Sequence, residues 1–231
     1  MVEVLPLCKS SHVQHGKGVR MIDLWLRQEG AAWFGIAEYG GKLAATCVAG
    51  TREEASRILV QCLPPGAPHR LAEGPSAFAD TTARMLAAIE AGDESCKRFE
   101  LAIEVVPEPA ASVFRLVATI PCGYACSYGR IAEAAGTTAR AVGRFMAGNP
   151  LYPIVPCHRV VGSDFSLVGY RGMTSGPDLD DKLARLRAEA RGFSREMTLE
   201  DAHGLRVFPV EWVIAKAERD RGDDLPGMTL S

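Results

Sequence analysis

The residues best suited to chemistry are Cys157 and His158, which are adjacent in the run PCHRV at positions 156–160. Free cysteine has a pKa of about 8.5 and attacks as its thiolate, so it needs a cationic or proton-accepting neighbour. His158 and Arg159 can each serve as that neighbour. Adjacent residues on a strand point to opposite faces, so Cys157 and His158 cooperate only if the chain turns or a water relays the proton. Pro156 favours such a turn.

Two other interpretations compete with a nucleophilic cysteine at this position. A strand end with a small buried cysteine and an ordinary histidine gives the same letters. A cysteine hydrolase also uses a thiol and an imidazole, but it needs facing side chains, and no separate oxyanion motif accompanies Cys157. The elements around the pair must distinguish these alternatives.

Length and composition narrow the class of protein. The chain has 231 residues, 47% of them hydrophobic, which predicts a globular protein with a substantial core. No apolar run approaches the roughly 20 residues of a membrane span. Glu3, Pro6 and Lys9 interrupt any signal-peptide pattern at the N-terminus. We therefore expect a cytoplasmic protein, nuclear if the source is eukaryotic, with no membrane partner.

The seven cysteines are scattered and odd in number, which favours reduced thiols over a disulfide framework, with one or two bridges still open. They are Cys8, Cys47, Cys62, Cys96, Cys122, Cys126 and Cys157. Two small groups resemble partial metal sites, Cys8 with His12 and His15, and Cys122 with Cys126. Neither makes a four-ligand zinc set at the usual spacing, so we predict no metal.

The net charge of −2 excludes a uniformly basic nucleic-acid-binding protein, so DNA binding needs a local positive surface. Residues 120–172 supply one, with five arginines against two acidic residues. The arginines are Arg130, Arg140, Arg144, Arg159 and Arg171, and the acidic residues are Glu133 and Asp164.

The pattern of elements predicts a mixed α/β domain at 1–106. Residues 32–39 and 42–49 are β-prone and flank Gly40-Gly41, a hairpin signal because glycine allows the positive φ of a tight turn. Further predicted elements are a strand at 19–27, a helix that Thr51 and Glu54 cap and Pro64-Pro65 ends, a helix at 76–91 and a strand at 99–106. A linker at 107–112, a catalytic and DNA-binding domain at 113–193 and an extension at 194–231, with a helix from Pro209, complete the expected layout.

Two short helices joined by a tight turn are predicted between positions 127 and 148. Ser127 is the N-cap of the first, which ends at Gly136, and Thr137 or Thr138 caps the second. This is helix-turn-helix spacing. The second helix has an apolar inner stripe and a basic, smooth outer stripe that can approach a phosphate backbone closely. The inner residues are Ala141, Val142, Phe145 and Met146, and the outer ones are Arg140, Gly143, Arg144 and Ala147. A surface helix with two solvated arginines would give the same pattern.

Together these segments resemble the O6-alkylguanine-DNA alkyltransferase family, also called methylated-DNA–protein-cysteine methyltransferases. The resemblance covers residues 120 to about 189. The motifs that carry it, in order, are IPxG at 120–123, SYG at 127–129, RAVG at 140–143, NP at 149–150, PCHRVV at 156–161 and GYxG at 169–172.

The resemblance implies a fold and an activity. The N-terminal domain would be ribonuclease H-like, and the C-terminal domain mostly α-helical with a winged-helix-like helix-turn-helix. The activity would be direct-reversal DNA repair, in which an alkyl group moves irreversibly from O6 of guanine, or O4 of thymine, in duplex DNA to Cys157 after base flipping. One transfer would exhaust each monomer, without an organic cofactor. A non-catalytic protein that binds alkyl damage is the alternative, and Cys157 argues against it.

The resemblance also implies catalytic roles. Cys157 would accept the alkyl group, His158 would be its base through a water, and Glu189 would orient the imidazole. Asn149 would hold the active-site turn by hydrogen bonds. Tyr128 would assist the leaving base and its rotation out of the duplex.

The implied DNA contacts lie on and beside the second helix, where Arg140 would fill the stack that the flipped base vacates. The predicted DNA-binding residues are Ser127, Thr138, Arg140, Ala141, Gly143 and Arg144. The predicted guanine pocket consists of Tyr128, Val160, Tyr170, Arg171 and Met173.

Departures from the family pattern concern the pocket wall. The turn within 128–140 is about two residues shorter than in many members, Met173 replaces an expected glycine, and residues 174–178 are inserted. These changes affect the tolerance for bulky alkyl groups and leave the nucleophile in place. Glu189 is assigned through its seven-residue spacing from Lys182, with Glu200 and Glu211 as weaker alternatives.

Overall fold

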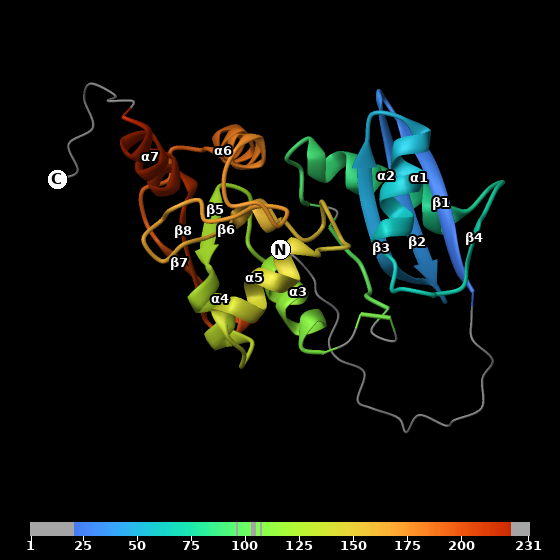
Figure 1. The fold of residues 1–231 in the computed structure, drawn as a ribbon, viewed down its shortest axis with the longest axis horizontal. Helices are drawn as coiled ribbons and strands as arrows, with labels where there is room; N and C mark the ends of the chain where they lie inside the picture. Colours follow the sequence, from blue (N-terminus) through green and yellow to red (C-terminus); the bar gives the residue numbers. More distant parts are fainter. Residues whose placement is uncertain (1–20, 96, 103–104, 107, 223–231) are drawn as a thin grey trace. The chain divides into compact units, whose positions relative to one another are not determined.

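The structure is a computed structural model that describes residues 21–222 except 96, 103–104 and 107 (Figure 1). The chain forms two compact units. Unit 1 comprises residues 1–111 and 149–155, and unit 2 comprises residues 112–148 and 156–231. Unit 1 is an α/β domain, and unit 2 is largely helical with a small sheet. None of the helices described is long and apolar enough to cross a membrane.

A four-stranded sheet forms the centre of unit 1. Its strands are β1 (Ile22–Glu29), β2 (Ala32–Tyr39), β3 (Lys42–Ala49) and β4 (His69–Leu71), in the order β3-β2-β1-β4. β1, β2 and β3 are antiparallel neighbours, whereas β4 runs parallel to β1. The predicted hairpin is confirmed, because Gly40 and Gly41 have φ values of 62° and 84° between β2 and β3. The predicted strand at 19–27 corresponds to β1, and β4 was not anticipated.

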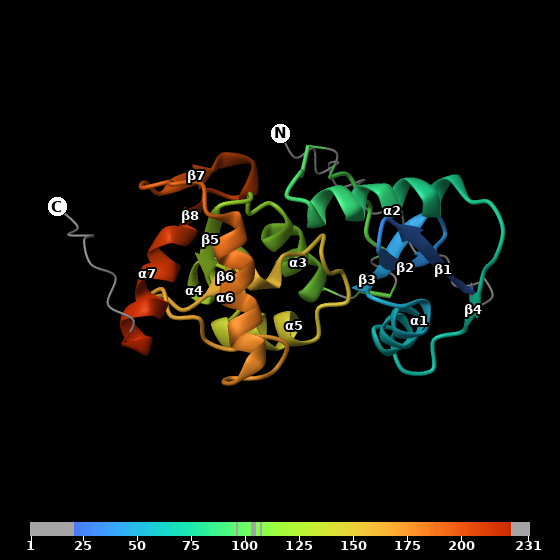
Figure 2. The ribbon, with the colours of Figure 1, turned by 90° about the horizontal axis from the view of Figure 1, so that it is seen from above.

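Two helices cover the sheet of unit 1. α1 (Arg52–Gln61) begins after Thr51, whose hydroxyl accepts from Glu54 N, as the capping box predicts. α2 (Ala77–Glu90) begins after Ser76 and confirms the helix predicted at 76–91. The helices lie against opposite faces of the sheet (Figure 2). Helices therefore cover both faces of β2, which explains its continuous run of buried residues.

The strand predicted at 99–106 is wrong over its described part. Leu101 forms only an isolated bridge with Leu43 of β3. The backbone then turns, because the N–H groups of Val105 and Val106 both donate to the carbonyl of Ala102. A strand needs continued pairing, and this turn diverts the chain from the sheet edge after one bridge.

Unit 2 contains the predicted helix pair. α4 (Tyr128–Ala134) begins after Ser127, whose hydroxyl accepts from Arg130 N. α5 (Ala139–Ala147) begins after Thr138, which resolves the choice between the two threonines, and its hydroxyl accepts from Ala141 N. Gly136, at φ 62°, occupies the turn between them. α3 (Ala110–Ala118) precedes the pair and begins within the segment expected as a linker.

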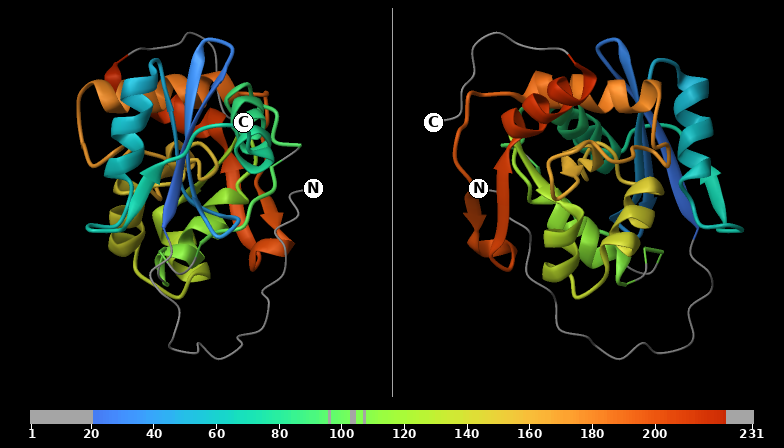
Figure 3. Two further views of the ribbon diagram at one scale, coloured as in Figure 1. Left: turned by 90° about the vertical axis from the view of Figure 1, so that its right-hand side faces the viewer. Right: turned by 60° about the vertical axis from the view of Figure 1, so that its left-hand side comes forward.

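The C-terminal part of unit 2 is more structured than its sequence pattern indicated. β5 (Tyr124–Ser127), β6 (Val160–Val161), β7 (Met197–Leu199) and β8 (Leu205–Pro209) form a sheet in the order β6-β5-β8-β7. β7 and β8 were not predicted, and Figure 3 shows them as the red strands that continue from the sheet into α7 (Val210–Arg221). α6 (Pro177–Glu189) carries both Lys182 and Glu189, and α7 confirms the helix expected from Pro209.

Candidate active site and nucleic-acid interface

Cys157 lies on a turn, not on a strand. Pro156 precedes a short 3-10 helix, Cys157–Arg159, in which the Arg159 N–H donates to the Pro156 carbonyl. Cys157 and His158 are both buried. The opposite-face objection that applies to adjacent strand residues therefore does not apply here.

His158 has one occupied and one vacant ring nitrogen. Its Nε2 lies 2.8 Å from Oε1 of Glu189. Its Nδ1 is buried and has no hydrogen-bond partner among the described residues. Burial lowers the pKa of His158, although Glu189 opposes this effect. The neutral imidazole with a proton on Nε2 therefore has Nδ1 available to accept a proton.

The Glu189 carboxylate is hydrogen-bonded to two side chains, those of His158 and Arg159. Arg159 donates from Nε to Oε2 at 2.8 Å and from Nη2 to Oε1 at 2.7 Å. Burial alone would raise the pKa of Glu189, but hydrogen bonds from His158 and Arg159 outweigh it and lower the pKa to about 2. Arg159 also donates from Nη1 to the Ile120 carbonyl at 2.7 Å. Glu189 is thus a carboxylate at neutral pH, fixed against the imidazole.

The other two glutamates considered as partners of His158, Glu200 and Glu211, do not contact it in the structure. Glu211 accepts hydrogen bonds from the backbone N–H groups of Arg191, Gly192 and Phe193. Glu200 is exposed in a short 3-10 helix. Of the three candidates, the structure brings Glu189 to His158.

Lys182, seven residues before Glu189, was not predicted as a site residue, but it lies beside Cys157. Its side chain is fully buried, and Nζ donates to the carbonyls of Val160, Leu167 and Gly169 at 2.7, 2.5 and 2.9 Å. Burial lowers its pKa to about 7, against the opposing effect of nearby Cys157. The three acceptors match the three protons of an ammonium group. A lysine within an amphipathic charged helix gives no sequence signal of such burial.

Two tyrosines flank the thiol. Burial, followed by the nearby Cys157, raises the pKa of Tyr128 to about 12 and also raises that of Tyr170. The Tyr128 hydroxyl donates to the Val168 carbonyl at 3.3 Å. The Tyr170 hydroxyl is buried without a hydrogen-bond partner in the described part of the chain. Both phenols stay protonated at neutral pH and can act as donors.

The remaining predicted pocket residues lie on a turn and a strand. Tyr170 and Met173 exchange two backbone hydrogen bonds of 2.7 and 2.8 Å across Arg171 and Gly172. Arg171 is exposed and pairs with Asp181 at 3.5 Å. Met173 is also exposed, whereas Val160 is buried in β6. The predicted residues thus form a buried part and an exposed rim.

Asn149 stabilises the turn that leads to the thiol. Its Nδ2 donates to the Val155 carbonyl at 2.8 Å, and its Oδ1 accepts from the Leu151 N–H at 3.0 Å. These bonds close the segment 149–155, which belongs to unit 1.

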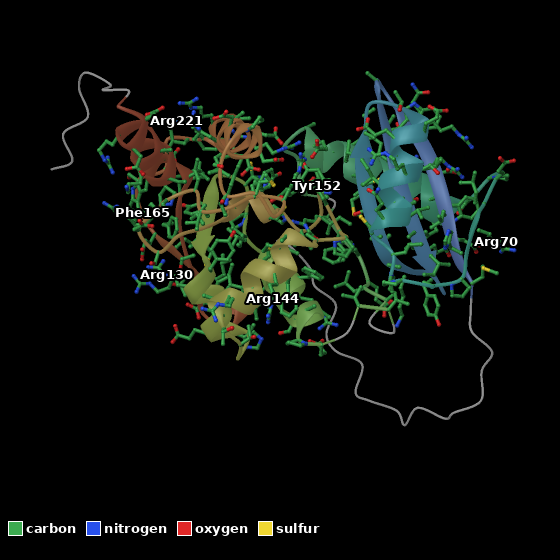
Figure 4. The ribbon with its side chains drawn as sticks, in the orientation of Figure 1. Arg70, Arg130, Arg144, Tyr152, Phe165 and Arg221 are labelled. Atoms are coloured by element: carbon green, nitrogen blue, oxygen red, sulfur yellow. The ribbon has the colours of Figure 1, made fainter. Side chains whose placement is uncertain are left out.

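The outer face of α5 is exposed and basic. Arg140, Arg144 and Thr138 are exposed, and Gly143 is half-buried; Arg144 is labelled in Figure 4. Of the other residues predicted to contact DNA, Ser127 and Ala141 are buried in the free protein. The available surface is therefore narrower than predicted and centres on the two arginines.

The described residues include no group of three or more His, Cys, Asp or Glu side chains that could hold a metal ion. Cys47, Cys62, Cys122, Cys126 and Cys157 carry thiols, not disulfides. Burial raises the pKa of Cys126 to about 12. Cys8, His12 and His15 lie outside the described residues.

A helix-turn-helix with a basic outer face, beside a buried thiol and a histidine held by a carboxylate, defines a DNA-binding protein with cysteine chemistry. Residues 108–191 match the family described as 6-O-methylguanine DNA methyltransferase, DNA binding domain. The chain is 39% identical over 132 residues to a methylated-DNA–protein-cysteine methyltransferase of Mycolicibacterium paratuberculosis, covering 56% of this chain and 75% of that protein. The chain therefore belongs to the methylated-DNA–protein-cysteine methyltransferase family.

Other relatives agree with this assignment. A Pyrobaculum aerophilum protein of the same name is 60% identical over 53 residues, which cover 23% of this chain and 36% of that protein. The crystal structure of O6-methylguanine-DNA methyltransferase from Pyrococcus kodakaraensis matches with a TM-score of 0.52 and 25% identity, over 74% of this chain and 100% of that chain. The family match ends at residue 191, so β7, β8 and α7 lie beyond it.

Proposed function

We propose that this protein removes alkyl groups from O6 of guanine in duplex DNA by transferring them to the sulfur of Cys157. As a family member it is a direct-reversal DNA-repair enzyme of the cysteine S-methyltransferase class. The observation that carries the residue assignment is the buried His158, whose Nε2 is held by Glu189 while Nδ1 is vacant. A cytoplasmic location and a monomeric state stay predictions.

In this mechanism His158 Nδ1 takes the Cys157 proton through a water, and the Glu189 carboxylate stabilises the resulting imidazolium. The thiolate attacks the alkyl carbon, so an S–C bond forms as the C–O6 bond breaks. Guanine leaves with the electron pair and gains a proton at N1, assisted by the Tyr128 hydroxyl. The thiol proton thus ends formally on guanine. The thioether is stable, so each molecule reacts once.

DNA delivery is assigned to the exposed face of α5. A base inside a duplex must be flipped out before a protein can reach its substituents. Arg140 and Arg144 are exposed on this face. Arg140 would fill the vacated stack, and Arg144 would contact phosphate.

The finer fold assignments rest on topology. Three antiparallel strands, a helix, a strand parallel to β1 and a second helix support a ribonuclease H-like assignment for unit 1. The α4–α5 pair beside a small sheet supports a winged-helix-like assignment for unit 2. Neither assignment carries the proposed chemistry.

The decisive experiment incubates the protein with duplex DNA that contains O6-methylguanine. Intact-protein and peptide mass spectrometry should find one added methyl group on Cys157 and no second turnover. Cys157→Ala should bind DNA without transfer, and Cys122→Ser should transfer normally as a matched control. An unmodified Cys157 despite confirmed DNA binding would contradict the proposal, and repeated turnover would favour a hydrolase.

The role of Arg140 has its own test. Arg140→Ala should slow repair of duplex DNA more than it slows reaction with free O6-benzylguanine, because the free base needs no flipping. Arg144→Ala, from the same face of α5, should weaken DNA affinity while leaving transfer at saturating DNA unchanged. Equal losses on both substrates would remove Arg140 from the flipping step.

A further inference from the structure

The loop that follows β6, residues 162–170, comes shortly after the turn that carries Cys157 and ends at the pocket residue Tyr170. We call it the post-acceptor loop. The Tyr128 hydroxyl donates to its Val168 carbonyl, and Lys182 donates to its Leu167 and Gly169 carbonyls. The positions of both flanking tyrosines therefore depend on the shape of this loop.

The post-acceptor loop has an unfavourable backbone. Phe165 has φ 66° and Val168 has φ 28°, in a region that side chains other than glycine rarely adopt. Such conformations persist only where surrounding contacts hold them. Val168 is held through its carbonyl, which accepts from the Tyr128 hydroxyl, whereas Phe165 is held through its ring.

Phe165 is held by an aromatic cluster, formed with Phe208 and Trp212. Its ring meets Phe208 edge-on at a centroid distance of 4.8 Å and Trp212 edge-on at 5.4 Å. Phe208 and Trp212 are parallel to each other at 6.3 Å. The Arg130 guanidinium lies over the ring of Phe208, 5.5 Å from its centroid. Phe165 and Arg130 are labelled in Figure 4. Edge-to-face pairs at these distances are favourable.

The two partners of Phe165 come from the part of the chain beyond the family match. Phe208 lies on β8, which pairs with β5 and so is fixed in the sheet. Trp212 lies on α7, which Glu218 ties to Arg187 of α6 at 2.9 Å. Both elements are therefore anchored independently of the post-acceptor loop, as a support must be.

We propose that Phe208 and Trp212 brace the post-acceptor loop through Phe165 and are positioning residues for the alkyl-transfer pocket. The C-terminal segment is then part of the active-site support. The expected effect on alkyl transfer rests on the proposed function, whereas the expected effect on the loop conformation does not. Without the brace, Phe165 relaxes from its positive φ, and the Val168 carbonyl and Tyr170 lose their fixed positions.

The structural consequence is tested by hydrogen exchange. Trp212→Ala should raise amide exchange in residues 162–170, and Trp212→Phe should restore protection because a ring edge remains available to Phe165. Val213→Ala is the matched control. Val213 is the next residue of α7 and lies fully buried in the core cluster against which Phe165 packs, so its truncation lowers stability while all three aromatic rings stay in place.

The kinetic consequence is tested with free O6-benzylguanine. The transfer rate is measured over a series of benzylguanine concentrations, so that the rate at saturation and the half-saturating concentration are obtained separately. Trp212→Ala should lower the saturating rate by about tenfold, since small misplacements of reacting groups have effects of this size or greater. Trp212→Phe should recover most of the rate, and Val213→Ala should leave it within about twofold of the parent. Phe165→Ala combined with Trp212→Ala should be no slower than either single variant.

The outcomes separate the brace from the proposed function. Unchanged exchange in 162–170 with Trp212→Ala overturns the brace, as does an equal rate loss with Val213→Ala. Absence of transfer by the parent protein overturns the proposed function instead, while the exchange comparison still decides the brace.

Discussion

At the residue scale, each charged side chain buried near Cys157 has hydrogen-bond partners for its charged group. An unpaired buried charge is costly, so buried ions survive in cores as hydrogen-bonded pairs. Arg159 and Glu189 form such a pair, with the remaining Nη1 of Arg159 used by the Ile120 carbonyl. Within the described part of the chain, Lys182 pairs with no carboxylate, and its ammonium group donates instead to three carbonyl groups. Burial keeps the histidine neutral at pH 7, and its vacant Nδ1 is the nitrogen that we propose accepts the thiol proton.

Glu189→Gln should slow alkyl transfer and lower the free energy of unfolding by roughly 3–5 kcal/mol, because it leaves the buried Arg159 charge without its counterion. Urea denaturation and single-turnover transfer measure the two effects. Asp180→Asn is the control, since Asp180 forms an exposed pair with Arg221 whose loss should change stability by less than about 1 kcal/mol. Similar losses in both variants would contradict the buried-pair argument.

The free energy of unfolding should decrease in two stages as the pH is lowered. The pKa of His158 is lowered below 6.5, so its stabilising neutral form is present above pH 6.5 and lost as the pH falls below it. The pKa of Glu189 is lowered from 4.5 to about 2, so its contribution, roughly 3 kcal/mol, is present above pH 4.5 and lost towards pH 2. Urea midpoints measured from pH 7 to pH 2.5 should show both stages. Glu189→Gln should lack the second, and a second stage of equal size in that variant would refute the assignment.

At the element scale, the chain that leads to Cys157 is supported by the N-terminal sheet. The segment 149–155 belongs to unit 1, where Leu151 forms a parallel bridge with Thr46 of β3. The Thr46 N–H donates to the Pro150 carbonyl at 2.7 Å, and its hydroxyl donates to the Tyr152 carbonyl at 2.9 Å. Because Thr46 is buried, both bonds are protected from water. The N-terminal domain thus holds the residues immediately before the acceptor turn.

Thr46→Val should lower the free energy of unfolding by about 1–3 kcal/mol, because the Tyr152 carbonyl loses its donor while the side-chain shape is kept. Hydrogen exchange should rise in residues 149–155, and single-turnover transfer should slow. Tyr152→Phe, which removes the hydroxyl bond to the Glu90 carboxylate from the same segment, should cost less because that bond is exposed. A larger loss in Tyr152→Phe than in Thr46→Val would place the anchor elsewhere.

At the scale of the whole molecule, DNA binding must arise from charge distribution, since the net charge is only −2. Several arginines outside α5 are neutralised by acidic partners, as in the pairs Arg187–Glu218 and Arg221–Asp180. Arg140 and Arg144 project from the helix that is predicted to meet the phosphate backbone. A protein of this kind binds DNA through a few phosphate contacts, and its affinity depends on salt accordingly.

The logarithm of the DNA association constant should therefore fall linearly with the logarithm of the salt concentration. Arg144→Ala should reduce that slope by about 1, the value for one lost phosphate contact. Fluorescence anisotropy over a salt series measures it. Arg221→Ala should leave the slope unchanged because Arg221 pairs with Asp180 on the surface of α6. An unchanged slope in Arg144→Ala would exclude its phosphate contact.

The sequence alone determined the features that depend on short-range interactions. The Gly40-Gly41 hairpin, the caps at Thr51 and Ser127, and the helix pair follow from turn geometry and hydrogen bonds between residues a few positions apart. These signals act within one turn of chain, so their partners can be read from neighbouring letters. Short-range signals also explain why the strand predicted at 99–106 is wrong. The residues are β-prone, but a strand needs continued pairing with β3, and only Leu101 forms a bridge to it in the described residues.

Only the tertiary structure decided the contacts between distant residues. It brings Glu189 to His158 across 31 positions, closes three carbonyl groups around Lys182, and places segment 149–155 on the N-terminal sheet. It also sets Phe165 against two aromatic rings from the C-terminal segment. The physical reason is that burial and long-range pairing depend on how elements pack, which the letters around each residue do not specify.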